Sequence, residues 1–212
     1  MKINKKNTKV MIFNTSKKRD FTPQFQKNNQ DIDVVDELKL LGVMITNELK
    51  WNSNTTYITK IGYKKLWILR RLKSFGATQD ELKDIYIKQV RSILEYAAVV
   101  WHAGLTQLNT SDIERVQKCA FAIILGNNYD TYENALKSLN MERLSERRNK
   151  LCKTFASKTF KNEKYAQWFV PDIKATDTRR ETKVVKPVQT RTRRFQKSAL
   201  PFLTNLLNQN QM

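Results

Sequence analysis

The first fifty residues carry short apolar runs that are separated by polar, turn-forming residues. Runs of this length predict β-strands at Thr8–Asn14, Phe21–Gln26, Ile32–Val35 and Leu40–Thr46, the last with a glycine at its centre. Lys27-Asn28-Asn29-Gln30 predicts a hairpin turn, and Pro23 places its run at a sheet edge. Because such short strands hold few apolar side chains, we expect them to belong to a larger sheet.

From residue 54 the spacing of apolar residues changes to the period of an amphipathic helix. The first predicted helix runs from Thr55 to Phe75 and stops at Gly76, a residue type that commonly ends helices. Five apolar residues share one arc of this helix and are expected to face a core: Ile58, Ile61, Ile68, Leu69 and Leu72.

Four further helices are expected after Gly76. The second spans Gln79–Ala103 and ends at Gly104, with an inward face of Leu82, Ile85, Tyr86, Ile93, Ala97 and Val100. Capping boxes at Ser111-x-x-Glu114 and Asp130-x-x-Glu133 predict the starts of the third and fourth, the third stopping at Gly126. The fifth spans Leu144–Phe160, with Leu144, Leu151 and Phe155 inward. Short connections favour an antiparallel bundle.

The periodicity fades beyond about residue 170. Lys174–Lys197 carries nine basic and two acidic residues and predicts an extended or disordered basic tail. Leu200–Leu207 is a short apolar segment that can dock back onto the bundle. The sequence therefore predicts an α+β fold of four segments: a β segment at 1–50, helices at 51–105, a further helical region at 106–165 and a basic tail at 166–212.

The charge of the chain indicates its partners. Its 212 residues carry a formal charge of +19, which favours RNA and DNA, contacted mainly through their phosphates. Two cysteines are too few for a disulfide framework or a zinc site and fit a reducing compartment. Without an apolar run of membrane-spanning length or a signal-peptide pattern, we expect an intracellular protein of the nucleus or cytoplasm.

The first predicted helix is the leading candidate for nucleic-acid binding. Six basic residues occur in fourteen positions without an acid: Lys60, Lys64, Lys65, Arg70, Arg71 and Lys73. Lys60, Lys64, Trp67 and Arg71 are spaced to line one face opposite the apolar arc, so the cations can follow a phosphate backbone and the indole can stack on a base. The alternatives are an ordinary solvated face and a Trp67 ring packed inside the protein.

Other charged groups offer weaker candidates. Two arginine clusters can contact phosphate without sequence preference or act as import signals: Arg191, Arg193 and Arg194 in the tail, and Arg147-Arg148. The acids of Asp31-x-Asp33-x-x-Asp36-Glu37 do not converge as metal ligands must, so we expect a charged hairpin edge and no metal site. His102 lacks a partner for a catalytic triad and fits a helix C-terminus, where a cation is favourable; no catalytic residue is expected.

The order of motifs resembles the end of the palm and the thumb of reverse transcriptases from non-LTR retrotransposons of the jockey or LINE type. Thr8–Asn14 resembles the strand after the catalytic aspartates, Leu40-Leu41-Gly42-Val43 the primer grip, and Leu49-Lys50-Trp51 with its helix the thumb. Further segments resemble the regions that follow the thumb in this family: Arg91–Tyr96 with Trp101, Ile113–Lys118, Arg147-Arg148 and Leu200–Thr204.

This resemblance implies descent from an RNA-directed DNA polymerase, with Leu41, Gly42 and Val43 in a turn that holds the primer end. The family's catalytic Tyr/Phe-Ala-Asp-Asp sequence does not occur, so we expect a truncated copy or fragment that binds template–primer but is inactive alone. Mg²⁺ is then expected only in a full-length polymerase, and the missing upstream portion is a possible partner. The alternative is a stand-alone basic helical protein that binds RNA or DNA.

Overall fold

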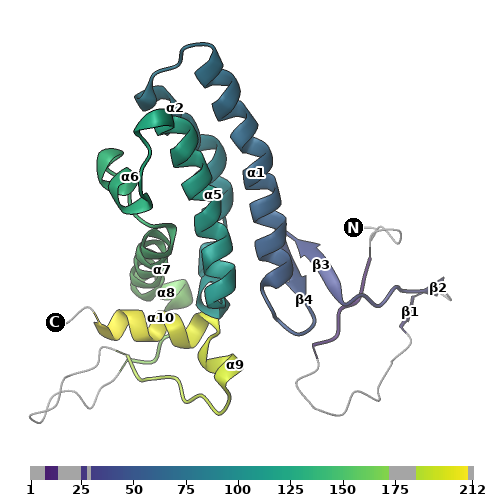
Figure 1. Cartoon of the computed structure of the whole chain (residues 1–212). Coiled ribbons are helices and arrows are strands. Elements are labelled where there is room, and N and C mark those ends of the chain that lie inside the picture. Colours follow the sequence, from purple (N-terminus) through teal and green to yellow (C-terminus); the bar gives the residue numbers. More distant parts are fainter. Residues whose placement is uncertain (1–7, 14–24, 28–29, 172–184, 210–212) are drawn as a thin grey trace, which may run out of the picture. The chain divides into compact units, whose positions relative to one another are not determined.

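The computed structural model describes residues 8–13, 25–27, 30–171 and 185–209 (Figure 1). The chain divides into two compact units, Met1–Tyr57 and Ile58–Met212. Antiparallel strand pairs lie in the first unit, and helices make up the second. The fold is therefore α+β with a helical bundle, as the sequence predicts.

The first unit is built on two small hairpins. Strands β1 (Gln26–Lys27) and β2 (Gln30–Asp31) form one antiparallel pair, and β3 (Glu37–Leu40) and β4 (Val43–Thr46) form the other. Thr8–Phe13 contributes only a parallel bridge between Val10 and Val34. The predicted strand Ile32–Val35 is wrong, because only Val34 within it forms a β-bridge with another segment. Most of the predicted strand Phe21–Gln26 lies outside the described residues.

The turn between β3 and β4 corrects the predicted strand Leu40–Thr46. Leu41 (φ 47°) and Gly42 (φ 87°) both adopt positive φ between the paired residues Leu40 and Val43. Positive φ at both central residues matches the type I′ turn, whose twist suits a two-residue hairpin. Gly42 therefore lies in a turn between two strands and not at the centre of one.

The first unit buries little apolar surface. Among its described residues before the first helix, Val43 is the one fully buried apolar side chain. Asn54, also buried, accepts a hydrogen bond from the Met44 amide at 3.1 Å and ties β4 to the start of the first helix. Small strand pairs with so few buried contacts are marginally stable.

Helix α1 (Asn52–Ser74) confirms the first predicted helix. It ends where Gly76 adopts φ 87° and the Ala77 amide bonds back to the Leu72 carbonyl, a helix-ending motif that needs positive φ. Ile58, Leu66 and Leu69 are buried. Gly62 lets α1 approach its neighbours closely, because a Cβ there would lie 3.0 Å from Val116 and 3.2 Å from Leu94.

The second predicted helix, Gln79–Ala103, is broken in the structure. It consists of α2 (Gln79–Ile85), the π-helical segment η2 (Tyr86–Arg91), α3 (Ser92–Glu95), α4 (Ala98–Trp101) and the 3₁₀ turn η3 (His102–Gly104). Ala97 adopts φ 51° between α3 and α4. A π turn adds a residue and rotates the following face, so Leu94, Ala98 and Trp101 are buried, whereas Val100, predicted to be inward, is 48% exposed.

The next helices begin at different caps from those predicted. Helix α5 (Gln107–Leu125) is capped by Thr106, whose hydroxyl accepts from the Asn109 amide, so the capping box at Ser111 is wrong. Helix α6 (Tyr132–Ser138) is capped by Thr131, one residue after Asp130. The stop at Gly126 is confirmed, since Gly126 (φ 60°) follows α5 directly.

The C-terminal part packs on helix α7. The prediction for α7 (Leu144–Lys161) is confirmed, although Phe155 is 39% exposed and not inward. Helix α8 (Glu163–Ala166) follows it. Of the predicted extended tail, residues 174–184 lie outside the described residues, and the short α9 (Arg193–Gln196) is a correction near its end. Helix α10 (Ala199–Asn208) packs against α7, as expected of Leu200–Leu207 (Figure 1). Their shared core is Cys152, Ala156, Phe169, Val185, Leu203 and Leu207.

Candidate nucleic-acid interface

One face of α1 is exposed over its length and carries the predicted basic residues. Lys60, Lys64 and Arg71 are exposed, and Trp67 between them has 64% of its surface accessible. Leu66 and Leu69 occupy the opposite, buried side. The structure therefore brings the four predicted residues onto one outer face, and the Trp67 ring is not packed inside the protein.

This face holds unneutralised positive charge. Helix α1 contains no acidic residue. Within the described part of the chain, none of Lys60, Lys64 and Arg71 forms an ion pair. The Arg71 guanidinium lies 4.6 Å from the centre of the Phe75 ring, which is itself 70% exposed. Cations that alternate with exposed aromatic rings suit a polyanion whose bases can stack.

The remaining predicted residues of α1 differ in accessibility. Arg70 is exposed and Lys65 is half-buried. The Lys73 ammonium donates to the carbonyl of Ile123 and, at 3.3 Å, to that of Ile124. These carbonyls lie at the C-terminal end of α5, where a positive charge interacts favourably with the helix dipole. Lys73 therefore holds α1 to α5 and has its donors engaged within the protein.

The tail arginines are exposed at the start of α9. Arg191, Arg193 and Arg194 all lie on the surface, and the Thr192 hydroxyl caps the helix by accepting from the Phe195 amide at 3.2 Å. No ion pair is seen for them within residues 185–209 or the other described ranges. They remain available to phosphate, on a short helical turn instead of an extended tail.

The hairpin turn of the first unit presents one leucine to solvent. Leu41 is 84% exposed at φ 47°, whereas Val43 is 6% exposed. A left-handed conformation is unfavourable for a leucine, and exposure of its side chain adds nothing to the core. The turn expected at Leu41-Gly42 is thus present, with an apolar residue at its tip.

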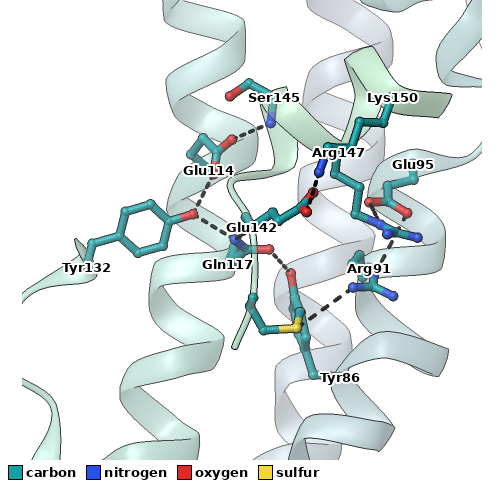
Figure 2. A network of polar contacts seen from close by, with 11 residues as sticks. Tyr86, Arg91, Glu95, Glu114, Gln117, Tyr132, Glu142, Ser145, Arg147 and Lys150 are labelled. Atoms are coloured by element: carbon teal, nitrogen blue, oxygen red, sulfur yellow. Dashed lines mark hydrogen bonds and ion pairs between the residues drawn. The ribbon is translucent and has the colours of Figure 1, made fainter. Parts of the chain in front are cut away.

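A buried hydrogen-bond network holds the helices of the second unit together (Figure 2). The Tyr86 hydroxyl donates to Gln117 Oε1 at 2.5 Å, and Gln117 Nε2 donates to Tyr132 Oη and to the Glu142 carbonyl. The Tyr132 hydroxyl donates to Glu114 at 2.6 Å. Burial, then the hydrogen bond to Glu114, raises the pKa of Tyr132, so it stays protonated as the donor.

Glu114 links this network to the start of α7. Its Oε1 accepts the Ser145 amide at 2.7 Å, which satisfies one of the unbonded donors at a helix N-terminus. Helices α5, α6 and α7 are therefore joined to η2 by polar groups that saturate one another. The network supports the bundle on which the exposed α1 face is built.

A second polar cluster surrounds Glu95 (Figure 2). Glu95 lies 2.6 Å from Arg147 Nε and 3.9 Å from Arg91 Nε. Burial raises the pKa of Glu95, and the two arginines oppose that shift. Arg148 is fully buried and donates to His102 Nδ1 at 3.3 Å. Arg147 and Arg148 therefore bond to groups inside the bundle. The sequence suggested that Arg148 contacts phosphate, and this prediction is wrong because the side chain is not accessible.

The remaining candidates receive structural partners. Burial, and then Arg148, lower the pKa of His102, so its neutral form is favoured and not the cation expected at a helix end. Asp31 accepts from Gln26, and Asp36 accepts from Asn47. In the described ranges no three His, Cys, Asp or Glu residues group as a metal site, and no helix there is both long and apolar enough to cross a membrane.

No protein-family model, curated protein or solved structure matches this chain. The residues themselves therefore carry the functional argument. The sequence identified the basic face of α1, but it did not single out the outer lysines of α7. Their signal in the sequence is a run of lysines at helical spacing from Lys150 to Lys161.

Proposed function

We propose that this chain binds template–primer nucleic acid through the exposed face of α1. The observation that carries the proposal is Trp67, 64% exposed among the cations Lys60, Lys64 and Arg71. An exposed indole at the centre of an unpaired basic face contributes little to folding. It suits a primer–template whose phosphates contact the cations and whose unpaired template bases stack on the indole.

The binding is expected to be electrostatic and independent of sequence. Each lysine or arginine that neutralises a phosphate releases a condensed counterion, which makes affinity fall steeply with salt. The exposed Arg191, Arg193 and Arg194 would add to the same effect. The chain is proposed to act in the nucleus or cytoplasm, where such ligands occur.

We further propose that the chain corresponds to the thumb side of a non-LTR reverse transcriptase. The support is the order of its motifs, with the Leu41-Gly42 turn followed by a basic helix. The chain contains no Tyr/Phe-Ala-Asp-Asp sequence, so Mg²⁺-dependent nucleotide addition is not assigned to it. The proposed role is to hold nucleic acid, with Leu41, Gly42 and Val43 as the primer-grip-like turn.

The test is a salt titration of binding to a labelled primer–template duplex, with a polymerisation assay alongside. Substituting Lys60, Lys64 and Arg71 by Ala should reduce the slope of log affinity against log salt by up to about three. A matched triple variant at Lys83, Lys88 and Lys137, on α2, η2 and α6, should keep the wild-type slope. Equal slopes for the two variants would remove α1 from the interface.

The alternative is a stand-alone basic RNA- or DNA-binding protein. The helical unit favours it in one respect, because the basic part of α1, from Lys60 onward, lies within Ile58–Met212 together with α9 and a separate core. The first unit distinguishes the two proposals. A fragment should show fast amide exchange in β3 and β4, because these strands bury so little, whereas an independent protein should protect them. Synthesis in the polymerisation assay would contradict both.

A further inference from the structure

Helix α7 carries a second basic face on its outer side. Lys150, Lys153, Lys158 and Lys161 are all exposed, and on a helical wheel all of them except Lys153 lie opposite the buried Cys152 and Ala156. Between residues 150 and 170 there are five lysines and one acid, Glu163. Lys150 forms an ion pair with Glu142, whereas neither Lys158 nor Lys161 forms one with any described residue.

An aromatic platform follows this face directly. The rings of Tyr165 and Trp168 lie 5.2 Å apart at 48°, and the Lys164 ammonium lies 5.5 Å from the centre of the Tyr165 ring. Trp168 is 47% exposed. A cation and an open indole beside one another form a surface on which an unpaired base can stack.

The platform is held in place by its neighbour in the chain. Phe169 is buried in the core shared by α7 and α10, and its ring makes an edge contact with Phe160 at 6.3 Å. The Trp168 amide donates to the Tyr165 carbonyl at 3.0 Å, closing a turn. Because Phe169 is fixed inward, the adjacent indole is directed to the surface at little conformational cost on binding.

We propose that a surface at the end of α7, called the α7 site, binds a single-stranded nucleic-acid segment. It consists of Lys158 and Lys161 of α7 and of Lys164, Tyr165 and Trp168, which follow that helix. The proposal rests on the proposed function and adds a second contact with its own ligand preference. The lysines bind phosphates, and Trp168 stacks on a base. A duplex hides its base faces within its stack, whereas a single strand offers them. The occupant is therefore a single-stranded template or overhang.

The experiment compares two labelled probes, oligo(dT) and a blunt duplex of the same charge, at several salt concentrations. Trp168→Ala should weaken oligo(dT) binding about tenfold, the range expected for loss of one stacked base, and leave blunt-duplex binding unchanged. Trp168→Phe should retain most of the affinity, because it keeps an aromatic face. Lys158→Ala with Lys161→Ala should flatten the oligo(dT) salt slope by about one to two.

The outcomes separate the two proposals. Wild-type oligo(dT) binding that is unaffected by Trp168→Ala and by the double lysine variant overturns the α7 site while leaving the α1 interface intact. Equal losses on both probes would also overturn it, because they would indicate a general charge effect or misfolding, which circular dichroism of each variant identifies. A wild-type protein that binds neither probe at low salt would overturn both proposals.

Discussion

Arg148 Nε donates a hydrogen bond to His102 Nδ1 across 3.3 Å in the interior of the bundle. The acceptor role of Nδ1 places the imidazole proton on Nε2, which lies 2.9 Å from Asn149 Oδ1 and donates to it. The ring also makes an edge contact with Phe202 of α10 at 5.8 Å. His102 therefore joins η3 to α7 and α10 in its neutral form only.

This geometry predicts a loss of stability at acid pH. Burial and the nearby Arg148 lower the folded-state pKa of His102 below its ordinary value of 6.5. A depressed pKa means that the stabilisation is fully present above pH 6.5 and is lost as pH falls through the folded pKa. The free energy of unfolding, measured by urea titration between neutral pH and pH 5, should fall in the wild type.

The His102→Gln variant is the control, because it cannot titrate. Its stability should change less over the same interval. The comparison is needed because the raised pKa of Glu95 acts in the opposite sense, stabilising the fold as the carboxyl is protonated. Parallel curves for the two proteins would exclude His102 as the acid-sensitive group.

The buried Gln117 predicts a second stability effect. Its side chain bonds Tyr86, Tyr132 and the Glu142 carbonyl, so Gln117→Leu leaves the Tyr86 hydroxyl and that carbonyl without their buried partner. The free energy of unfolding should fall by about 2–4 kcal/mol. Adding Tyr86→Phe should recover part of the loss, since it removes one orphaned donor. Strict additivity of the two substitutions would argue against a coupled network.

The helices could be predicted from sequence where one period runs uninterrupted. Helix α1 keeps a single 3.6-residue phase from Ile58 to Leu72, so its exposed face and most of its inward face followed from spacing, although the fully buried Leu66 lies outside the predicted arc. The second helix could not be predicted in the same way. Its π segment and the left-handed Ala97 shift the inward face to Leu94 and Ala98, and neither leaves a glycine or proline in the sequence as a signal.

The candidate sites could also be predicted only in part, because spacing along one helix is visible in the sequence and contacts between distant residues are not. Charge spacing identified Lys60, Lys64 and Arg71, but it could not show that Lys73 turns to the carbonyls of α5, because that contact joins residues fifty positions apart. The inward direction of Arg148 was hidden for a similar reason. A fully buried guanidinium depends on tertiary partners such as His102, and side-chain polarity alone favours the surface.

The turn at Leu41 predicts a stabilising substitution in the first unit. Asparagine tolerates positive φ better than leucine, and Asn-Gly is the preferred pair for this turn. Because Leu41 is 84% exposed at φ 47°, Leu41→Asn should stabilise the β3–β4 hairpin by about 0.5–1 kcal/mol. Hydrogen exchange of the β3 and β4 amides should slow, and Gly42→Ala should accelerate it. Faster exchange in Leu41→Asn would mean that the leucine side chain is needed for the fold.

Lys73 and Lys64 lie on the same helix and should give opposite results when each is replaced by Met. The Lys73 ammonium is bonded to carbonyls at the end of α5, so Lys73→Met should lower the free energy of unfolding by about 1–2 kcal/mol. Its salt slope for duplex binding should stay at the wild-type value. Lys64 is exposed, so Lys64→Met should flatten the slope by about one and change stability by less than about 0.5 kcal/mol.

The two methionine variants remove the same charge and keep a similar apolar stem, so each serves as the control for the other. Urea unfolding supplies the stability, and fluorescence anisotropy with a labelled duplex supplies the salt slope. A flattened slope with unchanged stability in Lys73→Met would place its ammonium on phosphate instead of α5. Because both residues were predicted from the same cluster of charge, the pair measures how much of that cluster serves the fold and how much faces a ligand.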